Sequence, residues 1–279
     1  MNFRTALQVP PGTEITHRDR LLMLGSCFST EVGARLLRDG FNTTVNPTGT
    51  LYNPMSVAKT IGLLESCTPI LPGHLFENQG LWRSFDHHSS LSDPDRDKAL
   101  EKINSAITAG HKALQEATHV FVTFGTAWVF ELPEGGIVCN CHKLPPRNFI
   151  RRRVTVNEIV GTWTPILRRH PDKHFTFTVS PIRHTADGLH GNQLSKSTLL
   201  LAVDELCAGG AAEYFPAYEA LIDDLRDYRF YAADMKHPSD VAVDYVYSLF
   251  ASARFSQSTM TRAAEAARAS RRAAHRPLH

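Results

Sequence analysis

Two short segments near opposite ends of the chain carry residues suited to covalent catalysis. Asp234 and His237 lie three residues apart, so the carboxylate can reach the imidazole within one turn. A carboxylate so placed fixes the tautomer and orientation of the ring and leaves the other ring nitrogen free to act as a base. Gly25, Ser26 and Cys27 add two candidate nucleophiles in a run of small residues. The simpler interpretation is a surface histidine and an inert buried thiol beneath a tight turn.

The hydrophobic pattern predicts the elements that would position these residues. Strands are expected at 20–24, 41–45, 118–124, 174–179 and 213–215, and helices at 28–37, 55–64, 97–117, 155–169, 192–206 and 239–255. Such alternation is typical of a mostly parallel sheet covered by helices on both faces, a three-layer α/β/α fold. Ligands of such sheets bind beyond the carboxyl ends of the strands, where 25–27, 46–54, 125–128 and 180–192 are expected to lie.

One domain is predicted over residues 18–256, with an N-terminal extension at 1–17 and an Ala/Arg-rich flexible tail at 257–279. Residues 68–95 are irregular and could form a lid wall with Trp82, Phe85, His87 and His88, or an exposed polar loop. A hairpin is expected over 129–139. The run Arg151-Arg152-Arg153 is interpreted as a solvated face.

Composition excludes several classes of protein. Lys plus Arg number 30 against 28 Asp plus Glu, which argues against nucleic acid as a partner. No apolar run approaches the ~20 residues of a membrane span, and a signal peptide is not expected. Five cysteines without a disulfide spacing favour a reducing cytoplasm. A weaker hypothesis gives the Arg-rich end a role in binding RNA or a membrane surface, and the oligomeric state stays open.

Several blocks in order resemble one known family. They are Gly25-Ser26-Cys27-Phe28, then Asn46-Pro47 with the run from Gly49 to Pro54, Gly125-Thr126-Ala127-Trp128, Cys141-His142-Lys143, the run from Ser180 to His184, Asp187-Gly188, and the run from Tyr231 to Ser239. The similarity covers about residues 20 to 255 and is to the GSCFA family, which is grouped with the GDSL-like, or SGNH, hydrolases. The resemblance implies a flavodoxin-like fold and an ester-hydrolase type of site, without a defined substrate.

The departures from the wider superfamily bear on catalysis. Ser26 takes the place of an aspartate, and Cys27 takes the place of the nucleophilic serine, so Cys27 is the favoured nucleophile and Ser26 the alternative. The resemblance implies oxyanion donors at the backbone N–H groups of Cys27 and Gly49. Ala127 replaces the third donor, an asparagine, for which Trp128, Asn53 and Asn46 are candidates. A helix N-terminus and a nearby histidine would lower the pKa of the Cys27 thiol.

Further residues could bind the substrate. His142, Lys143, Arg183 and His184 follow predicted strand ends, where Lys143 or Arg183 would meet an anionic group, although bracing of loops is equally consistent. Cys139 and Cys141 lack a second pair at zinc-ligand spacing, so neither a metal nor a cofactor is predicted. The sequence therefore predicts a hydrolase or acyltransferase acting on small-molecule or glycan esters through a covalent acyl-enzyme. The alternative is a non-catalytic glycan-binding module, which the missing asparagine favours.

Overall fold

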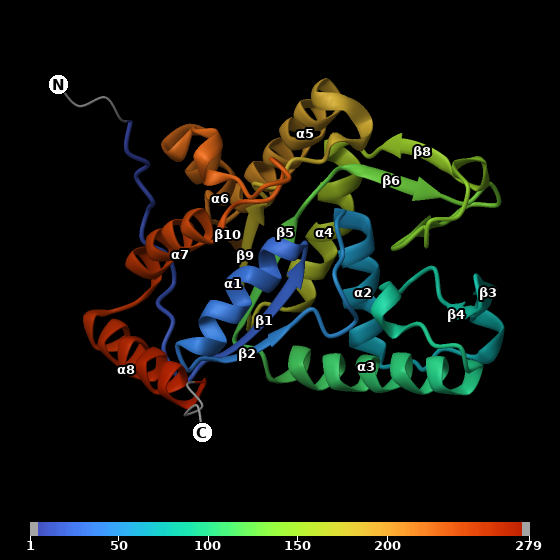
Figure 1. Cartoon of the computed structure of the whole chain (residues 1–279), viewed down its shortest axis with the longest axis horizontal. Helices are drawn as coiled ribbons and strands as arrows, with labels where there is room; N and C mark the ends of the chain where they lie inside the picture. Colours follow the sequence, from blue (N-terminus) through green and yellow to red (C-terminus); the bar gives the residue numbers. More distant parts are fainter. Residues whose placement is uncertain (1–4, 275–279) are drawn as a thin grey trace.

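The computed structural model describes residues 5–274 and forms an α/β fold around a five-stranded sheet (Figure 1). Its strands are β1 (Arg20–Gly25), β2 (Asn42–Val45), β5 (His119–Phe124), β9 (His174–Val179) and β10 (Ala212–Tyr214). All neighbours are parallel, in the order β2-β1-β5-β9-β10. Counted along the chain, this is the 2-1-3-4-5 order of flavodoxin-like sheets. The predicted mostly parallel, helix-covered sheet is confirmed.

The sheet order reverses direction between β1 and β5. The chain proceeds from β1 to β2 on one side, and from β5 through β9 to β10 on the other. In open sheets of this kind, the crevice for a ligand lies outside the carboxyl ends of the two strands that flank the reversal. The loops that follow Gly25 and Phe124 are therefore the expected place for a site.

Helices cover both faces of the sheet. One face carries α2 (Pro54–Ser66), α3 (Arg96–Glu116), α4 (Val156–Arg169) and α5 (Gly188–Ala208), and the other carries α1 (Cys27–Arg38) and α7 (Asp240–Arg254) (Figure 1). In β1, Leu22 and Leu24 face the first layer, while Leu21 and Met23 face the second. Because both faces are covered, the strand is apolar throughout instead of alternating with polar residues.

The helix boundaries agree with local capping chemistry. Thr155 and Glu158 form the predicted capping box at the start of α4, and Ser239 caps α7 through the N–H of Ala242. Two short elements before α7, which the sequence does not reveal, are α6 (Ala217–Glu219) and a π-helical turn over Ala220–Leu225.

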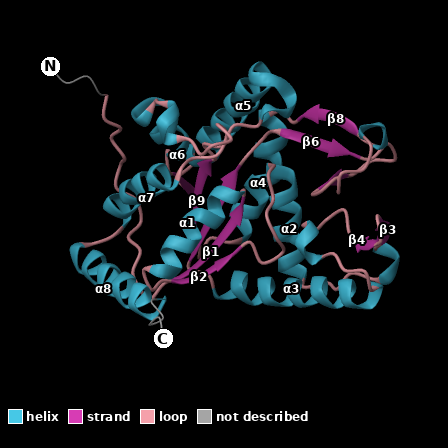
Figure 2. Cartoon of the chain, in the orientation of Figure 1, coloured by secondary structure: helices cyan, strands magenta, loops and turns pink. Residues whose placement is uncertain are grey.

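Two small antiparallel sheets stand apart from the central sheet in Figure 2. They consist of β3 (Phe76–Asn78) with β4 (Leu81–Arg83), and of β6 (Trp128–Glu131) with β7 (Ile137–Val138) and β8 (Ile150–Arg153). The hairpin predicted over 129–139 is confirmed as β6 and β7. The interpretation of Arg151-Arg152-Arg153 as a solvated face holds in part: Arg153 is exposed, and the half-buried Arg152 pairs with Glu131 and Glu158 at 2.7 Å each, whereas Arg151 lines a cavity.

The Ala/Arg-rich segment is a helix and not a flexible tail over its described part. Helix α8 spans Gln257–Ala274, and Ala263 and Ala267 are buried. A Cβ at Gly40 would lie 2.9 Å from the Cβ of Ala266. Small residues at helical spacing thus let α8 approach the end of α1 closely. Residues 275–279 of the predicted tail lie outside the described residues.

The predicted N-terminal extension also packs on the domain in its described part. Ile15 is fully buried, and its N–H donates to the carbonyl of Arg254 at 2.9 Å. Thr13 Oγ1 donates to the carboxylate of Glu213 at 2.6 Å. The segment from 5 to 17 therefore belongs to the same fold as α7 and β10.

Candidate active site

The turn between β1 and α1 requires glycine at position 25. Gly25 has a φ of +126°, and a Cβ there would lie 2.2 Å from the carbonyl oxygen of Thr123 on β5. Any side chain would therefore strain the backbone and collide with the neighbouring strand. The N–H of Gly25 donates to Asn46 Oδ1 at 2.9 Å. This tight turn places Ser26 and Cys27 at the reversal point of the sheet.

Ser26 and Cys27 have different environments. Ser26 is fully buried, and its Oγ accepts the N–H of Phe28 at 3.3 Å as the N-cap of α1. Cys27 is the first residue of α1 and is partly exposed. Because the hydroxyl is enclosed and engaged in capping, the geometry favours Cys27 over Ser26 as the nucleophile.

The expectation of a lowered thiol pKa is contradicted at Cys27. Burial raises the pKa of Cys27, and the carboxylate of Glu31 raises it further. The N–H groups at the start of α1 and the side chain of Lys196 favour the thiolate, but they do not outweigh burial. The thiol is therefore protonated at neutral pH, and its attack on a carbonyl requires a base.

Asp234 and His237 form the pair that their spacing predicts. Nδ1 of His237 lies 2.5 Å from Oδ2 of Asp234, whose Oδ1 also accepts the backbone N–H groups of His237 and Lys236. These hydrogen bonds hold the pKa of Asp234 well below its usual range, and the bond from the backbone N–H of His237 has the largest effect. Asp234 thus stays ionised and orients the ring. Within residues 5–274, Nε2 of His237 has no hydrogen-bond partner.

The segment with His237 lies against the loop that follows β9. The N–H of Arg183 donates to the carbonyl of Lys236 at 3.1 Å. His237 and His184 also interact electrostatically. The imidazole of His237 is therefore held at the carboxyl end of the sheet, on the same edge as the turn that carries Cys27.

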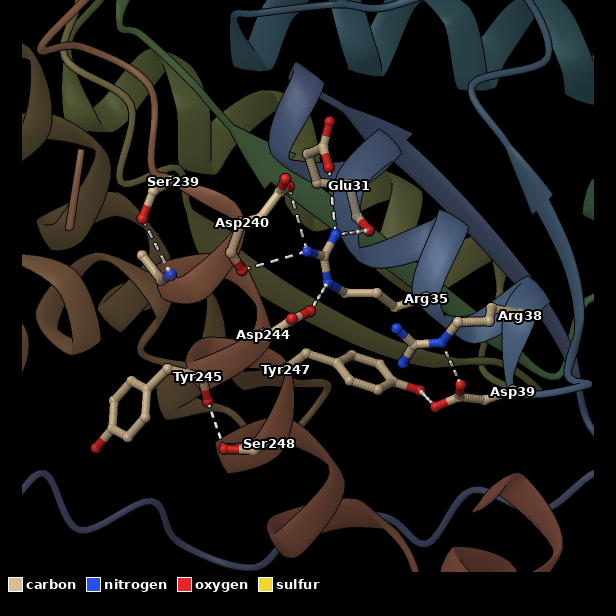
Figure 3. Close-up of polar contacts among 11 residues, drawn as sticks. Glu31, Arg35, Arg38, Asp39, Ser239, Asp240, Asp244, Tyr245, Tyr247 and Ser248 are labelled. Atoms are coloured by element: carbon tan, nitrogen blue, oxygen red, sulfur yellow. Dashed lines mark hydrogen bonds and ion pairs between the residues drawn. The ribbon is translucent and has the colours of Figure 1, made fainter. Parts of the chain in front are cut away.

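A buried arginine ties α1 to the start of α7 (Figure 3). Arg35 reaches three carboxylates: its Nε lies 2.6 Å from Asp244, its Nη1 3.2 Å from Glu31 and its Nη2 3.7 Å from Asp240. Glu31 lies one helical turn after Cys27, and Asp240 lies three residues after His237. This clamp holds the segment with the base beside the N-terminal half of α1.

Replacing Arg35 by alanine is expected to destabilise the protein by about 2 kcal/mol, because the packed stem and the clamp are both lost. The free energy of unfolding in urea measures this. Arg268→Ala, on an exposed side of α8, is the control and should change stability by less than about 0.5 kcal/mol. Equal stability of the two variants would show that Arg35 does not clamp the helices.

The candidate oxyanion donors are mostly occupied. The N–H of Gly49 donates to the carbonyl of Asn46 at 2.8 Å, so the structure does not leave it free for an oxyanion. Nδ2 of Asn53 donates to Ser56, Nδ2 of Asn46 to Thr30, and Nε1 of Trp128 to Gly191. Ala127 is fully buried in the core. The N–H of Cys27 has no acceptor within its own helix, as is general for a first helical residue.

A cavity of ≈ 330 Å³ opens next to this turn. Tyr52, Trp128 and His184 line it, while Cys27 and His237 do not. Tyr52 nevertheless interacts electrostatically with Cys27, and burial raises the pKa of Tyr52, so its hydroxyl stays protonated. Aromatic walls with a few polar groups among them are typical of small-molecule sites.

His184 and Arg151 are two of the polar residues that line this cavity. A Cβ at Gly125 would lie 3.1 Å from Nε2 of His184 and 3.4 Å from Cβ of Ser26. Burial lowers the pKa of His184 to about 3, and Nε2 is buried without a partner in the described part of the chain. Arg151 stacks on Trp128 and forms a two-point ion pair with Asp187 at 3.1 and 2.7 Å. The imidazole is thus neutral, with its Nε2 enclosed beside Gly125.

The structure separates the other predicted binding residues. His142 is buried, with Nε2 2.7 Å from the carbonyl oxygen of Ser84, and it braces the β3–β4 hairpin instead of facing the cleft. Lys143 is exposed. Arg183 stacks on Tyr228 and Tyr231 and lines a different cavity, of ≈ 350 Å³. Of the predicted binding set, Asn53, Trp128 and His184 line the cavity of ≈ 330 Å³.

The irregular segment 68–95 packs on the domain over residues 83–88, whereas much of the rest of it is exposed. His88 lines the same cavity as Tyr52, and a Cβ at Gly49 would lie 2.1 Å from Cβ of His88. His87 is buried, and the carbonyl of Phe85 accepts the N–H of Cys139 at 2.8 Å. The segment therefore forms part of the cavity wall through His88.

Sequence reasoning missed Tyr52, Arg151 and Lys196 as site residues. Lys196 is fully buried beneath the site, with Nζ 2.6 Å from the carbonyl oxygens of both Gly125 and Ser180. For Lys196 the sequence does contain a signal of burial. Lys196 precedes Leu199 and Val203 at helical spacing, so it lies on the apolar face of the predicted helix.

The fold and this site define an α/β protein with a histidine–carboxylate pair at the carboxyl edge of a flavodoxin-like sheet. The chain belongs to the GSCFA family, whose sequence model matches residues 20–250. Neither the curated proteins nor the solved structures contain a match to this chain.

Residues 5–274 contain neither a cluster of potential metal ligands nor a helix that could span a membrane. No three or more His, Cys, Asp or Glu side chains of this region are grouped so that they could hold a metal ion. None of its helices combines the length and apolarity needed to cross a membrane.

Proposed function

We propose that this protein is a hydrolase or acyltransferase of the GDSL-like, or SGNH, type that acts on acyl esters through an acyl-enzyme at Cys27. The observation that carries the proposal is the Asp234–His237 pair, held by the Arg35 clamp beside the helix that Cys27 begins. A nucleophile and a base oriented by a carboxylate are the recurring components of covalent acyl transfer.

The reaction has two steps. His237 Nε2 takes the thiol proton as Cys27 Sγ attacks the ester carbonyl, a C–S bond forms, and the C–O bond breaks as His237 protonates the departing alcohol. His237 then deprotonates a water or an acceptor alcohol, which attacks the thioester. The acid or new ester leaves, and the proton returns to Cys27. Each step uses the imidazole once as base and once as acid.

Negative charge on the carbonyl oxygen needs donors aimed at it. The N–H of Cys27 at the start of α1 is one donor, supported by the positive end of the helix. The hydroxyl of Tyr52 is the second, because it stays protonated and interacts with Cys27. In this proposal Tyr52 replaces the asparagine that donates to the oxyanion in the wider superfamily, because this chain has Ala127 at that position.

The residues that line the cavity next to the turn indicate which kind of alcohol the ester substrate contains. Tyr52 and Trp128 offer aromatic faces, and the neutral ring of His184 and the side chain of Asn53 line the cavity with them. These groups suit an esterified sugar better than a plain aliphatic alcohol. A cytoplasmic location stays a prediction, with all five cysteines free as thiols in the structure.

The proposal is tested by acyl release from p-nitrophenyl acetate and from a panel of acetylated sugars, with Cys27→Ala measuring the background. Turnover by the wild-type protein, with a preference for sugar esters over the aryl ester, is the expected result. Sugar binding in calorimetry without turnover of any ester would instead establish the alternative, a non-catalytic glycan-binding module. The occupied oxyanion positions and the raised pKa of Cys27 are the observations that favour that alternative.

Replacing Tyr52 by phenylalanine is expected to lower kcat by about 10²-fold, the effect typical of removing one oxyanion donor. KM should change little, because the ring remains in the cavity wall. Steady-state kinetics on the best ester of the panel provide both constants. A rise in KM at unchanged kcat would assign Tyr52 to substrate binding alone.

A further inference from the structure

The reaction described above does not use the second cavity, of ≈ 350 Å³. Arg183 lines this cavity, whereas the next residue along the chain, His184, lines the cavity of ≈ 330 Å³. Tyr231 also lines it and forms a bridge with Pro238, across the short loop that carries His237. The second cavity is therefore next to the base of the proposed reaction.

Most of the wall of the second cavity is aromatic or aliphatic. Tyr218, Tyr228 and Tyr231 line it together with four leucine or isoleucine side chains. Two of these lining residues are largely in contact with water, since Tyr228 is 63% and Leu189 60% exposed. Large apolar side chains exposed around a concave surface are typical of a site that a ligand covers.

The backbone is irregular where it forms one side of the second cavity. The π-helical turn over Ala220–Leu225 contributes Leu221 and Ile222 to the wall, and Arg226 ends the turn with a φ of +49°. The N–H of Arg226 donates to the carbonyl of Leu221 at 3.0 Å. Turns of this kind are rare and frequently found at functional sites, and a left-handed backbone costs free energy in a residue other than glycine. This costly turn places Arg226 at the cavity.

The two arginines that line the second cavity have no carboxylate partner. Among residues 5–274, neither Arg183 nor Arg226 forms an ion pair. Asp227 is the acidic residue of the lining, and its two oxygens accept the backbone N–H and the guanidinium of Arg229 at 2.8 and 3.0 Å. Arg183 lies 5.7 Å from the ring centre of Tyr228 and donates to its hydroxyl at 3.4 Å. The guanidinium groups therefore keep donors for a ligand.

Arg38 is a structural arginine with which Arg183 can be compared. It also stacks on a tyrosine, at 5.9 Å from the ring centre of Tyr247, but its Nε lies 2.7 Å from a carboxylate oxygen of Asp39. Arg183 has the same kind of aromatic contact without the carboxylate. A bound anion would supply this missing group.

Two amide side chains of α5 add donors to the second cavity. Oδ1 of Asn192 accepts the N–H of His184 at 2.9 Å, and Oε1 of Gln193 accepts the hydroxyl of Tyr218 at 3.1 Å. In the described part of the chain, the amide nitrogens of these two residues donate to no other group. Because both residues line the cavity, its polar groups are mainly donors, as an oxyanion requires.

We propose that the cavity of ≈ 350 Å³ binds an organic oxyanion, with its charged group against Arg183 and Arg226 and its apolar body on the tyrosine rings. The forked N–H donors of a guanidinium suit a carboxylate or a phosphate equally. Since the cavity is next to His237, the anion is assigned as a part of the ester substrate. This assignment rests on the proposed function, whereas binding of the anion does not.

An NMR titration of the wild-type protein with three probes tests the proposal. Phenylacetate and phenyl phosphate carry the two kinds of charged group on a similar aromatic body, and phenylacetamide is the neutral equivalent of phenylacetate. At least one anion should bind about tenfold or more tightly than the amide. The tighter of the two identifies the charged group of the ligand. Equal affinities for all three probes, or no binding of either anion, would overturn the proposal.

Variants of the two arginines locate the binding. Arg183→Gln and Arg226→Gln should each weaken binding of the tighter anion about tenfold or more. Arg38→Gln, which removes a guanidinium from a tyrosine ring elsewhere, should leave the affinity unchanged. An unchanged affinity in folded Arg183→Gln contradicts the proposal, and the comparison of probes on the wild-type protein stands if that variant does not fold. Neither measurement needs turnover of an ester, so a failure of the proposed function is distinguishable from a failure of this site.

Discussion

Replacing Cys27 by alanine is expected to lower the rate of acyl release at least about 10³-fold, while Ser26→Ala keeps most of it. The reason is geometric: Cys27 is partly exposed at the start of α1, whereas Ser26 is fully buried and caps that helix. Ser26→Ala should instead cost about 1 kcal/mol of stability through the lost cap. Steady-state hydrolysis and urea unfolding of both variants measure the two effects.

The opposite pattern would exchange the two roles. If Ser26→Ala is folded but inactive while Cys27→Ser is fully active, the hydroxyl of Ser26 is the nucleophile. Cys67→Ala, at the C-cap of α2 and away from the sheet edge, controls for the loss of a thiol and should leave activity unchanged.

Replacing His237 by alanine is expected to lower kcat/KM by about 10² to 10⁴-fold throughout the neutral pH range. Burial keeps Cys27 protonated there, so the thiol depends on a base at every neutral pH and does not supply its own thiolate. Asp234→Asn should have a smaller effect, because the ring remains but loses the carboxylate that orients it. Profiles of kcat/KM against pH for the wild-type protein and both variants measure this dependence.

His190→Ala serves as the control, since His190 is an exposed histidine on α5. It should retain the wild-type profile. A His237→Ala variant that loses activity only at low pH and regains it fully as the thiol ionises would show that a free thiolate, without a base, performs the attack.

The sequence predicted the central sheet because its strands are short and nearly all apolar. The run from Leu21 to Leu24 has that character because helices cover both of its faces. The Asp234–His237 contact was also predictable, since it depends only on local spacing. Caps at Thr155 and Ser239 follow from the same local chemistry.

Features set by distant contacts were not predictable. The raised pKa of Cys27 arises from burial, which spacing cannot measure. Gly49 lost its expected role for a local reason, since its N–H donates to the carbonyl of Asn46 in the same turn, and residue types alone did not indicate that turn. The α8 helix depends on Ala263 and Ala267 reaching a layer formed by other parts of the chain, so composition alone indicated a flexible tail.

His142 and Lys196 are two further residues whose surroundings the sequence did not predict. His142 follows a conspicuous motif, yet its ring binds the carbonyl of Ser84 in a hairpin that the sequence did not place nearby. Lys196 carries no motif, and only its position on an apolar helix face marks it. Ser84 lies 58 residues from His142 and Gly125 lies 71 residues from Lys196, while the second carbonyl partner of Lys196, Ser180, lies 16 residues away.

The central claim, a covalent acyl-enzyme at Cys27, is tested most directly by trapping that intermediate. The protein is mixed with p-nitrophenyl acetate or the best sugar ester, quenched with acid within the first turnover, and digested for mass spectrometry. The account predicts an added acyl group on the peptide that contains Ser26 and Cys27, localised by fragmentation to Cys27 and removed by hydroxylamine. Turnover with the acyl group on Ser26, or with no acylated residue at all, would contradict it.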